Sequence, residues 1–333
     1  MSRPSQAASR LPALTGVRGV AALWVVAYHF TRGVPVIERG ALGVDLFFML
    51  SGFILSYAHD GARVVRDWRD QRDFLKLRLA RIYPLYAATL LLLGLYVLAD
   101  PGFADSYPLA RQRWGLDSFV ASLLLVQNWG HFLPTCWNTP AWSLSAEWFA
   151  YLGFPLFQRL TRPARAVYLP LLLAAGCLAG FVAAMVALGI DRPDLAGTPG
   201  MARVVSEFAA GCLLFTAWRN GLPTLGAWAD AAALLLLAIA VLAGGRLAWI
   251  ALPGFALVLL LGAQGHGAIA RALAQPPLVW LGKVSYSLYL THWIVLQIGL
   301  RVVTLLDPPR ADAASTRWLL GALCLAVAAI PFA

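Results

Sequence analysis

Long runs of apolar residues alternate with shorter polar connections along the whole chain. A helix that crosses a bilayer needs about 20 predominantly apolar residues, and most of these runs approach that length. The pattern therefore predicts an all-α fold, a polytopic transmembrane helical bundle. The eleven candidate segments lie at about residues 12–31, 41–58, 79–99, 117–130, 141–158, 167–190, 203–218, 227–243, 247–263, 279–303 and 317–333.

The segment 117–130 is the exception, because about 14 residues are too few for a typical span. A segment of this length is typical of a re-entrant or interfacial piece. We therefore expect about ten spans plus this short segment. The polar run at 60–77, rich in Arg and Asp, is predicted to form a separate interfacial helix.

The composition agrees with a membrane protein. Of 333 residues, 60% are hydrophobic and 13% are charged, whereas soluble proteins carry about 25% charged residues. The mean hydropathy is +0.70. These values exclude a soluble enzyme and a disordered chain. No linker or repeat is visible, so residues 1–333 are expected to form a single membrane-embedded domain. The last apolar run has no basic residues after it, which suggests a truncated C-terminus.

The net charge of +10 is explained by topology, because basic residues gather in cytoplasmic loops and next to anionic lipid. No nucleic-acid partner is expected. Two basic connections orient the chain with both termini in the cytoplasm, as a multi-pass protein of the inner (cytoplasmic) membrane. Their basic residues are Arg63, Arg66, Arg69, Arg72, Lys76, Arg78 and Arg81 in the first and Arg159, Arg162 and Arg165 in the second.

The four cysteines give no sign of a metal site. Cys136, Cys177, Cys212 and Cys324 lack metal-ligand spacing, and three of them lie inside apolar runs. They are interpreted as small apolar residues, so neither a metal site nor a disulfide framework is expected.

Ionisable residues inside predicted spans are candidates for function, because a charged side chain in hydrocarbon costs about 2.5–3.5 kcal/mol on insertion scales. Arg18 and His29 lie eleven residues apart in one span, on nearly the same helix face and about 16 Å apart along the axis. One helix would thus present a cation near the cytoplasmic end and an imidazole toward the outer end. The alternative is a purely structural role, in which Arg18 extends to the inner membrane–water interface and His29 caps an outer turn.

Glu147 is expected at the depth of His29, in a span that enters from the outside. A carboxylate and an imidazole at one depth can form the base and its orienting partner in general acid–base catalysis. A structural ion pair is equally compatible with the sequence. Ser143 shares a helix face with Glu147, and Asp45 lies in the outer third of its own span, so both are candidates for substrate binding.

Two further groups stand out. Tyr289 and His292 share one helical stripe and are candidate substrate-binding residues, although such a stripe could also only join helices. Glu207, four residues after Arg203, is expected to form an intrahelical ion pair.

Arg78 and Arg81 are expected at the start of the helix that begins near residue 79. Two guanidinium groups beside unpaired N–H groups and the positive end of the helix dipole would form an anion site on the cytoplasmic face, which phosphates fit best. The alternative is a simple topology anchor.

Six motifs, in this order, resemble the acyltransferase-3 family of integral membrane acyltransferases. They are LTGVRGVAALWVVAYHF, GVDLFFMLSGFILSY, RLARIYPLY, WSLSAEWFAYLGFP, RVVSEFAAGCLLF and LGKVSYSLYLTHW, and together they cover most of the chain. Members have about ten transmembrane helices and transfer acyl groups, often acetyl from cytoplasmic acetyl-CoA, to hydroxyls of extracytoplasmic saccharides or glycolipids. The resemblance implies that His29 is the essential histidine, that Arg18, Arg78 and Arg81 belong to the donor side, and that Glu147 belongs to the reacting centre.

The resemblance leaves the histidine as either a base or a transient acyl carrier. Some members carry a fused extracytoplasmic domain that is not recognisable in this sequence, so a partner protein could replace it. The main alternative function is a proton-coupled transporter or flippase of envelope precursors, since such proteins also embed acids and histidines. A third alternative is a structural subunit of an envelope complex.

Overall fold

The computed structural model describes residues 11–31, 33–60, 65, 67–130, 136–161, 165–191, 196–311 and 313–329, and in these ranges all regular secondary structure is helical. Of the basic residues used for the topology, Arg63, Arg66 and Arg162 lie outside the described residues, as does the end of the last apolar segment, 330–333. The predicted all-α fold is confirmed.

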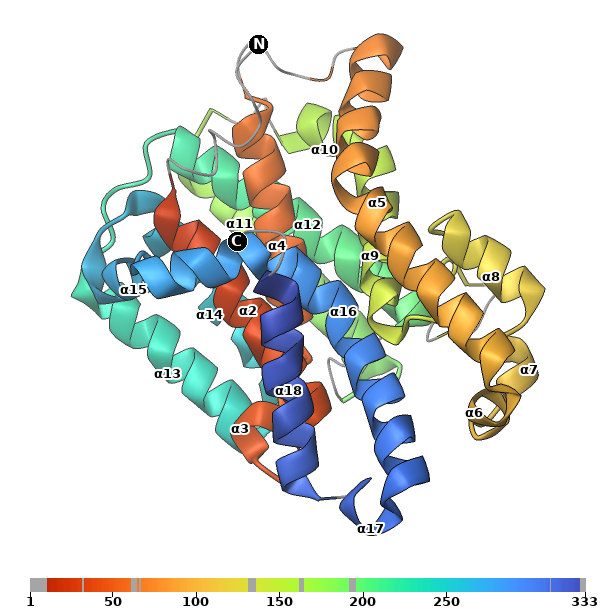
Figure 1. Cartoon of the computed structure of the whole chain (residues 1–333). Coiled ribbons are helices and arrows are strands. Elements are labelled where there is room, and N and C mark those ends of the chain that lie inside the picture. Colours follow the sequence, from red (N-terminus) through yellow and green to blue (C-terminus); the bar gives the residue numbers. More distant parts are fainter. Residues whose placement is uncertain are drawn as a thin grey trace.

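The helices form one bundle in which α2 and α4 lie near the centre and α5 stands to one side, next to α8 (Figure 1). In the described residues they are α2 (Pro12–Phe30), α3 (Pro35–Glu38), α4 (Leu42–Ala58), α5 (Trp68–Ala99), α6 (Pro101–Asp105), α7 (Ala110–Arg113), α8 (Leu116–Leu123), η2 (Thr139–Ala141), α9 (Trp142–Leu152), α10 (Phe154–Thr161), α11 (Tyr168–Ala187), α12 (Gly197–Arg219), α13 (Ala227–Ala243), η3 (Gly245–Ile250), α14 (Ala251–Gln264), α15 (Gly267–Leu273), α16 (Pro276–Leu306), α17 (Pro308–Ala311) and α18 (Ala314–Ala329).

Six helical segments in the described ranges are long and apolar enough to cross a membrane: α2, α5, α11, α12, the continuous segment η3–α14, and α16. Three more apolar helices, α4, α13 and α18, have 16 or 17 residues. The remaining predicted span, 141–158, is divided into α9 and α10 at Gly153. The chain is therefore a multi-pass membrane protein, and length and composition support six of the ten predicted spans.

The directions of neighbouring helices bear on the short segment 117–130. α4 and α12 run parallel, since Asp45 pairs with Arg203 at one end and Tyr57 packs on Trp218 at the other. Two parallel spans need an odd number of crossings between them. This requirement is met by three crossings: α5, α9 together with α10, and α11. A fourth crossing by the eight-residue α8 would make the number even. The expectation that 117–130 does not span the membrane agrees with this arrangement.

Glycines allow the central helices to pack backbone against backbone. A Cβ on Gly19 of α2 would lie 2.7 Å from the nitrogen of Gly282 in α16, and a Cβ on Gly211 of α12 would lie 2.0 Å from the carbonyl oxygen of Met49 in α4. Small residues are the usual solution where membrane helices meet closely. These two contacts fix α2 against α16 and α4 against α12. Three of these helices, α2, α4 and α16, line the cavity described below.

Candidate functional site

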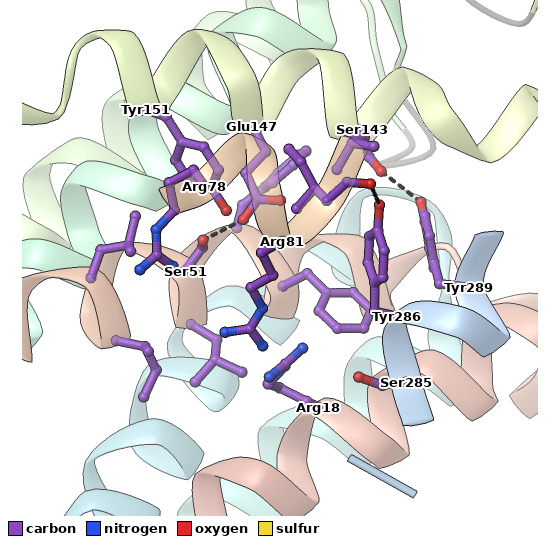
Figure 2. Close-up of a pocket in the computed structure, with 17 residues that line it drawn as sticks. Arg18, Ser51, Arg78, Arg81, Ser143, Glu147, Tyr151, Ser285, Tyr286 and Tyr289 are labelled. Carbon is purple, nitrogen blue, oxygen red and sulfur yellow. Dashed lines mark hydrogen bonds between the residues drawn. The ribbon is translucent and has the colours of Figure 1, made fainter. Parts of the chain in front are cut away.

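A cavity opens between α2, α4, α5, α9 and α16 and encloses about 930 Å³ of space outside the atoms, including its opening. Apolar side chains, such as Phe47 and Phe48 of α4, form part of its wall. Figure 2 shows that polar side chains from all five helices converge on it. The polar lining residues are Arg18, Ser51, Arg78, Arg81, Ser143, Glu147, Tyr151, Ser285, Tyr286 and Tyr289.

Three arginines from two helices point into this cavity. Arg18 of α2 and Arg78 of α5 are half-buried, and Arg81 of α5 is exposed. Glu147 of α9 is the carboxylate that faces them (Figure 2). With three guanidinium groups against one carboxylate, the cavity carries surplus positive charge in a partly apolar setting. Such a site suits an anion with several oxygens, because guanidinium groups bind phosphate and carboxylate through paired hydrogen bonds. The structure thus brings together in one cavity the three arginines that the resemblance assigned to the donor side.

The helical setting of Arg78 and Arg81 differs from the expectation. They do not lie at a helix start, because α5 is continuous from Trp68 to Ala99 and includes most of the predicted interfacial helix. Asp67 caps this helix by accepting a hydrogen bond from the backbone N–H of Asp70 at 2.9 Å. The N–H groups beside Arg78 and Arg81 are therefore used within the helix. Any attraction for an anion comes from the guanidinium groups and not from the helix dipole.

Glu147 lies beside Arg18 and does not contact His29, so the expected pair of Glu147 and His29 is not formed. Its carboxylate accepts a hydrogen bond from the hydroxyl of Ser51 on α4, and it interacts electrostatically with Arg18 and Arg78. Arg18 and His29 are three turns, or about 16 Å, apart on α2. Glu147 is therefore a counter-charge in the arginine cavity.

The displacement of Glu147 has a cause in the chain before α9. The turn η2 and its approach are buried within the bundle: the amide of Asn138 donates to the backbone carbonyl of Leu290 in the middle of α16, and Pro140 is buried. α9 therefore starts inside the protein rather than at its outer surface. Glu147, in the second turn of α9, therefore lies deeper in the bundle, beside Ser51 and Arg18.

Ser143 and Tyr289 meet at another part of the cavity wall (Figure 2). Their hydroxyl oxygens lie 2.6 Å apart, and both are within hydrogen-bond distance of the carbonyl oxygen of Pro140, at 3.1 Å and 3.0 Å. The sequence named both residues as candidates for substrate binding, and the structure brings them together.

His29 and His292 lie beside each other but outside the lining of this cavity. Nε2 of His292 is 3.2 Å from Nδ1 of His29, across the contact between α16 and α2. The connection to the cavity is Tyr289, whose hydroxyl lines it and whose ring centroid is 5.8 Å from that of His292. The partner of His29 in the structure is thus His292, which was predicted to bind substrate.

Asp45, predicted to contact substrate, is fully buried and engaged with Arg203. The Nε group of Arg203 donates to one carboxylate oxygen at 2.8 Å, and its Nη2 group donates to the other. Glu207 lies 3.6 Å from Nε of the same arginine, so the expected intrahelical pair exists as the weaker half of a three-residue cluster. Asp45 therefore joins α4 to α12 and has no open face for a substrate.

Replacing Asp45 by asparagine is expected to lower the stability of the protein by about 3 kcal/mol, because buried Arg203 loses both of its hydrogen bonds to a carboxylate and keeps only the more distant Glu207 as a counter-charge. Thermal unfolding in detergent measures this loss. The control is Asp73→Asn, which breaks the exposed ion pair with Arg72 and should change stability little. An Asp45→Asn protein that is as stable as the wild type but has a raised KM for acceptor would restore Asp45 to the substrate site.

Sequence reasoning did not select Ser51 and Tyr286 as site residues, although both line the cavity. Tyr286 donates a hydrogen bond to the backbone carbonyl of Ile82, next to Arg81 on α5. Ser51 could have been selected because its hydroxyl lies in the middle of an apolar run. Tyr286 could have been selected because it lies three residues before Tyr289, on the same side of the helix.

Comparisons with known proteins agree with the motifs. A family described as an acyltransferase domain matches residues 11–333. The acyltransferase MdmB of Streptomyces mycarofaciens is 31% identical, over 88% of this chain and 81% of that protein. Protein 2 of the picA locus of Rhizobium radiobacter is 42% identical, over 40% of this chain and 75% of that protein.

A protein of Staphylococcus aureus strain COL that is assigned as an O-acetyltransferase is 24% identical over 86% of this chain, and the match spans half the length of that protein. No solved structure matches the chain at a significant level. Together with the motifs and the multi-pass helical fold, the family match across nearly the whole sequence establishes that the chain belongs to the acyltransferase-3 family and is an acyltransferase.

Proposed function

We propose that the protein transfers an acetyl or other short acyl group from acyl-CoA to a hydroxyl of a saccharide or glycolipid. The observation that carries this proposal is the convergence of Arg18, Arg78 and Arg81 on one cavity of an acyltransferase. Coenzyme A is polyanionic, and guanidinium groups are well suited to its phosphates. The name of the Staphylococcus relative supports acetyl as the group and a hydroxyl as the acceptor.

The donor would enter at the cavity opening beside the exposed Arg81, on the side that the basic connections assign to the cytoplasm. This orientation places both termini in the cytoplasm. The membrane in this proposal is the inner (cytoplasmic) membrane. The extended pantetheine arm reaches about 15–20 Å, which matches the separation of Arg18 and His29 along α2, about 16 Å. To reach His29, the acyl end would pass Tyr289.

His29 acts as the general base in this proposal. Its Nε2 takes the proton of the acceptor hydroxyl while the hydroxyl oxygen attacks the thioester carbonyl. The carbon–sulfur bond breaks, coenzyme A leaves as the thiolate, and the proton on His29 returns to that sulfur. Glu147 holds Arg18 and Arg78 in place, and Ser143 and Tyr289 present hydroxyls to the acyl end or the acceptor. An acceptor-presenting partner protein is compatible with this arrangement.

The test uses purified protein in detergent or liposomes with acetyl-CoA that carries a labelled acetyl group. We expect slow hydrolysis without acceptor and labelled ester when envelope saccharides are added. Neither a transporter nor a structural subunit would consume acetyl-CoA. Undetectable turnover and undetectable binding of acetyl-CoA by well-folded protein would contradict the proposal.

A further inference from the structure

The contact between His29 and His292 has no carboxylate in it. Each ring lies within hydrogen-bond distance of a backbone carbonyl and of the other ring, and among the described residues neither imidazole is paired with Asp or Glu. His292 is completely buried, whereas His29 is partly exposed. A base that becomes charged in such a setting needs some other group to fix its orientation.

The two carbonyls determine where the protons are. Nδ1 of His29 lies 2.9 Å from the carbonyl oxygen of Val25, and Nδ1 of His292 lies 2.6 Å from that of Tyr289. A carbonyl oxygen only accepts hydrogen bonds, so each of these nitrogens carries a hydrogen. In the neutral rings both Nε2 atoms are then unprotonated.

This assignment also satisfies the contact between the rings. Nδ1–H of His29 is shared between the Val25 carbonyl and the lone pair on Nε2 of His292, 3.2 Å away. Nε2 of His29 has no hydrogen-bond partner among the described residues, and it is left as a lone pair that can accept a proton. All three hydrogen bonds are satisfied without a charge on either ring.

We propose that His292 is a positioning residue which, together with the Val25 carbonyl, holds His29 with its hydrogen on Nδ1 and accepts a charge-assisted hydrogen bond when Nε2 takes up the proton of the acceptor. This inference rests on the proposed role of His29 as base. The neutral imidazole of His292 takes the place that a carboxylate holds in many histidine bases. A neutral partner avoids burying a permanent negative charge in the membrane.

The position of His292 links this pair to the cavity. The carbonyl that orients His292 belongs to Tyr289, whose hydroxyl contacts Ser143 at the cavity wall. One turn of α16 therefore determines both the orientation of His292 beside His29 and the position of the Tyr289 hydroxyl at the cavity wall.

The first test is direct measurement of the tautomers by NMR of protein labelled with ¹⁵N-histidine, at a pH above the titration of both rings. We expect hydrogen on Nδ1 and a lone pair on Nε2 for both His29 and His292, with signals assigned from His29→Ala and His292→Phe. A hydrogen on Nε2 of His29 would overturn the inference. This result is independent of turnover, so it is separable from failure of the proposed acyl transfer.

The second test compares His292→Phe with His292→Gln. Phenylalanine removes the acceptor that faces His29, whereas the Oε1 atom of glutamine can take the place of Nε2. We expect kcat to fall about 10- to 100-fold in His292→Phe, the range for loss of a hydrogen bond to a charged group, with unchanged KM for donor and acceptor. His292→Gln should recover most of kcat at the same thermal stability. Equal losses in both variants, or a change confined to KM, would contradict the positioning role.

Discussion

His29→Ala is expected to lower kcat for acyl transfer by about 10²- to 10⁴-fold, the usual contribution of a general base. The protein should still fold, since His29 is partly exposed and lies in the last turn of α2. Binding of acetyl-CoA should be preserved, because the arginine cavity is about three helical turns away. The measurement is steady-state transfer of labelled acetyl, combined with equilibrium binding of the donor.

The matched control is His266→Ala, which removes an exposed histidine just before α15 and should leave kcat unchanged. Retention of full activity by His29→Ala at normal expression would end the role proposed for His29. Loss of donor binding together with activity would instead assign His29 to the donor site.

The double variant Arg78→Ala/Arg81→Ala is expected to raise the KM for acyl-CoA by roughly 100-fold or more, because each hydrogen bond to a charged group contributes about 1.5–3 kcal/mol. The effect on kcat at saturating donor should be smaller, since neither arginine is near the histidine pair. Donor titrations at fixed acceptor separate the two parameters.

The control for this variant is Arg69→Ala/Arg72→Ala. It removes the same charge with the same spacing from the same helix, α5, but neither residue lines the cavity. A general effect of charge on donor approach or on membrane insertion would appear equally in both double variants. An unchanged donor KM in Arg78→Ala/Arg81→Ala would contradict phosphate binding by this pair.

Much of the fold follows from local sequence. Nine of the ten predicted spans coincide with a helix or a continuous helical segment in the described residues, because hydrophobic length is a strong signal in a membrane protein. The split of 141–158 into α9 and α10 and the continuity of α5 were not predicted. In α5 the polar residues after Asp67 are good helix formers, so the change from polar to apolar composition does not end the helix.

The positions of candidate site residues could be predicted where they depend on spacing within one helix. Arg78 and Arg81 are one turn apart and therefore face one cavity, and Arg18 joins them from α2. The prediction failed where it depended on depth or on contacts between helices. Glu147 was misplaced because a buried approach to α9 cannot be read from hydrophobic length, and Asp45 was taken as available because its partner Arg203 is 158 residues away.

The histidine pair illustrates the same limit. Periodicity placed His292 in a polar stripe with Tyr289. That this stripe faces His29, across the contact between the parallel helices α2 and α16, could not be predicted from one helix alone. The close approach at Gly19 and Gly282 sets this register. Small residues are common in all membrane helices, so their partners become evident only in three dimensions.

The central claim is that one donor molecule spans the distance from the arginine cavity to His29. A cryo-electron microscopy structure of the protein with a non-hydrolysable acetyl-CoA analogue measures this directly. We predict phosphate oxygens within hydrogen-bond distance of Arg18, Arg78 and Arg81, and the acyl end past Tyr289 beside Nε2 of His29. Phosphates bound away from these arginines, or an acyl end that stops in the cavity at Glu147 with His29 out of reach, would contradict the account.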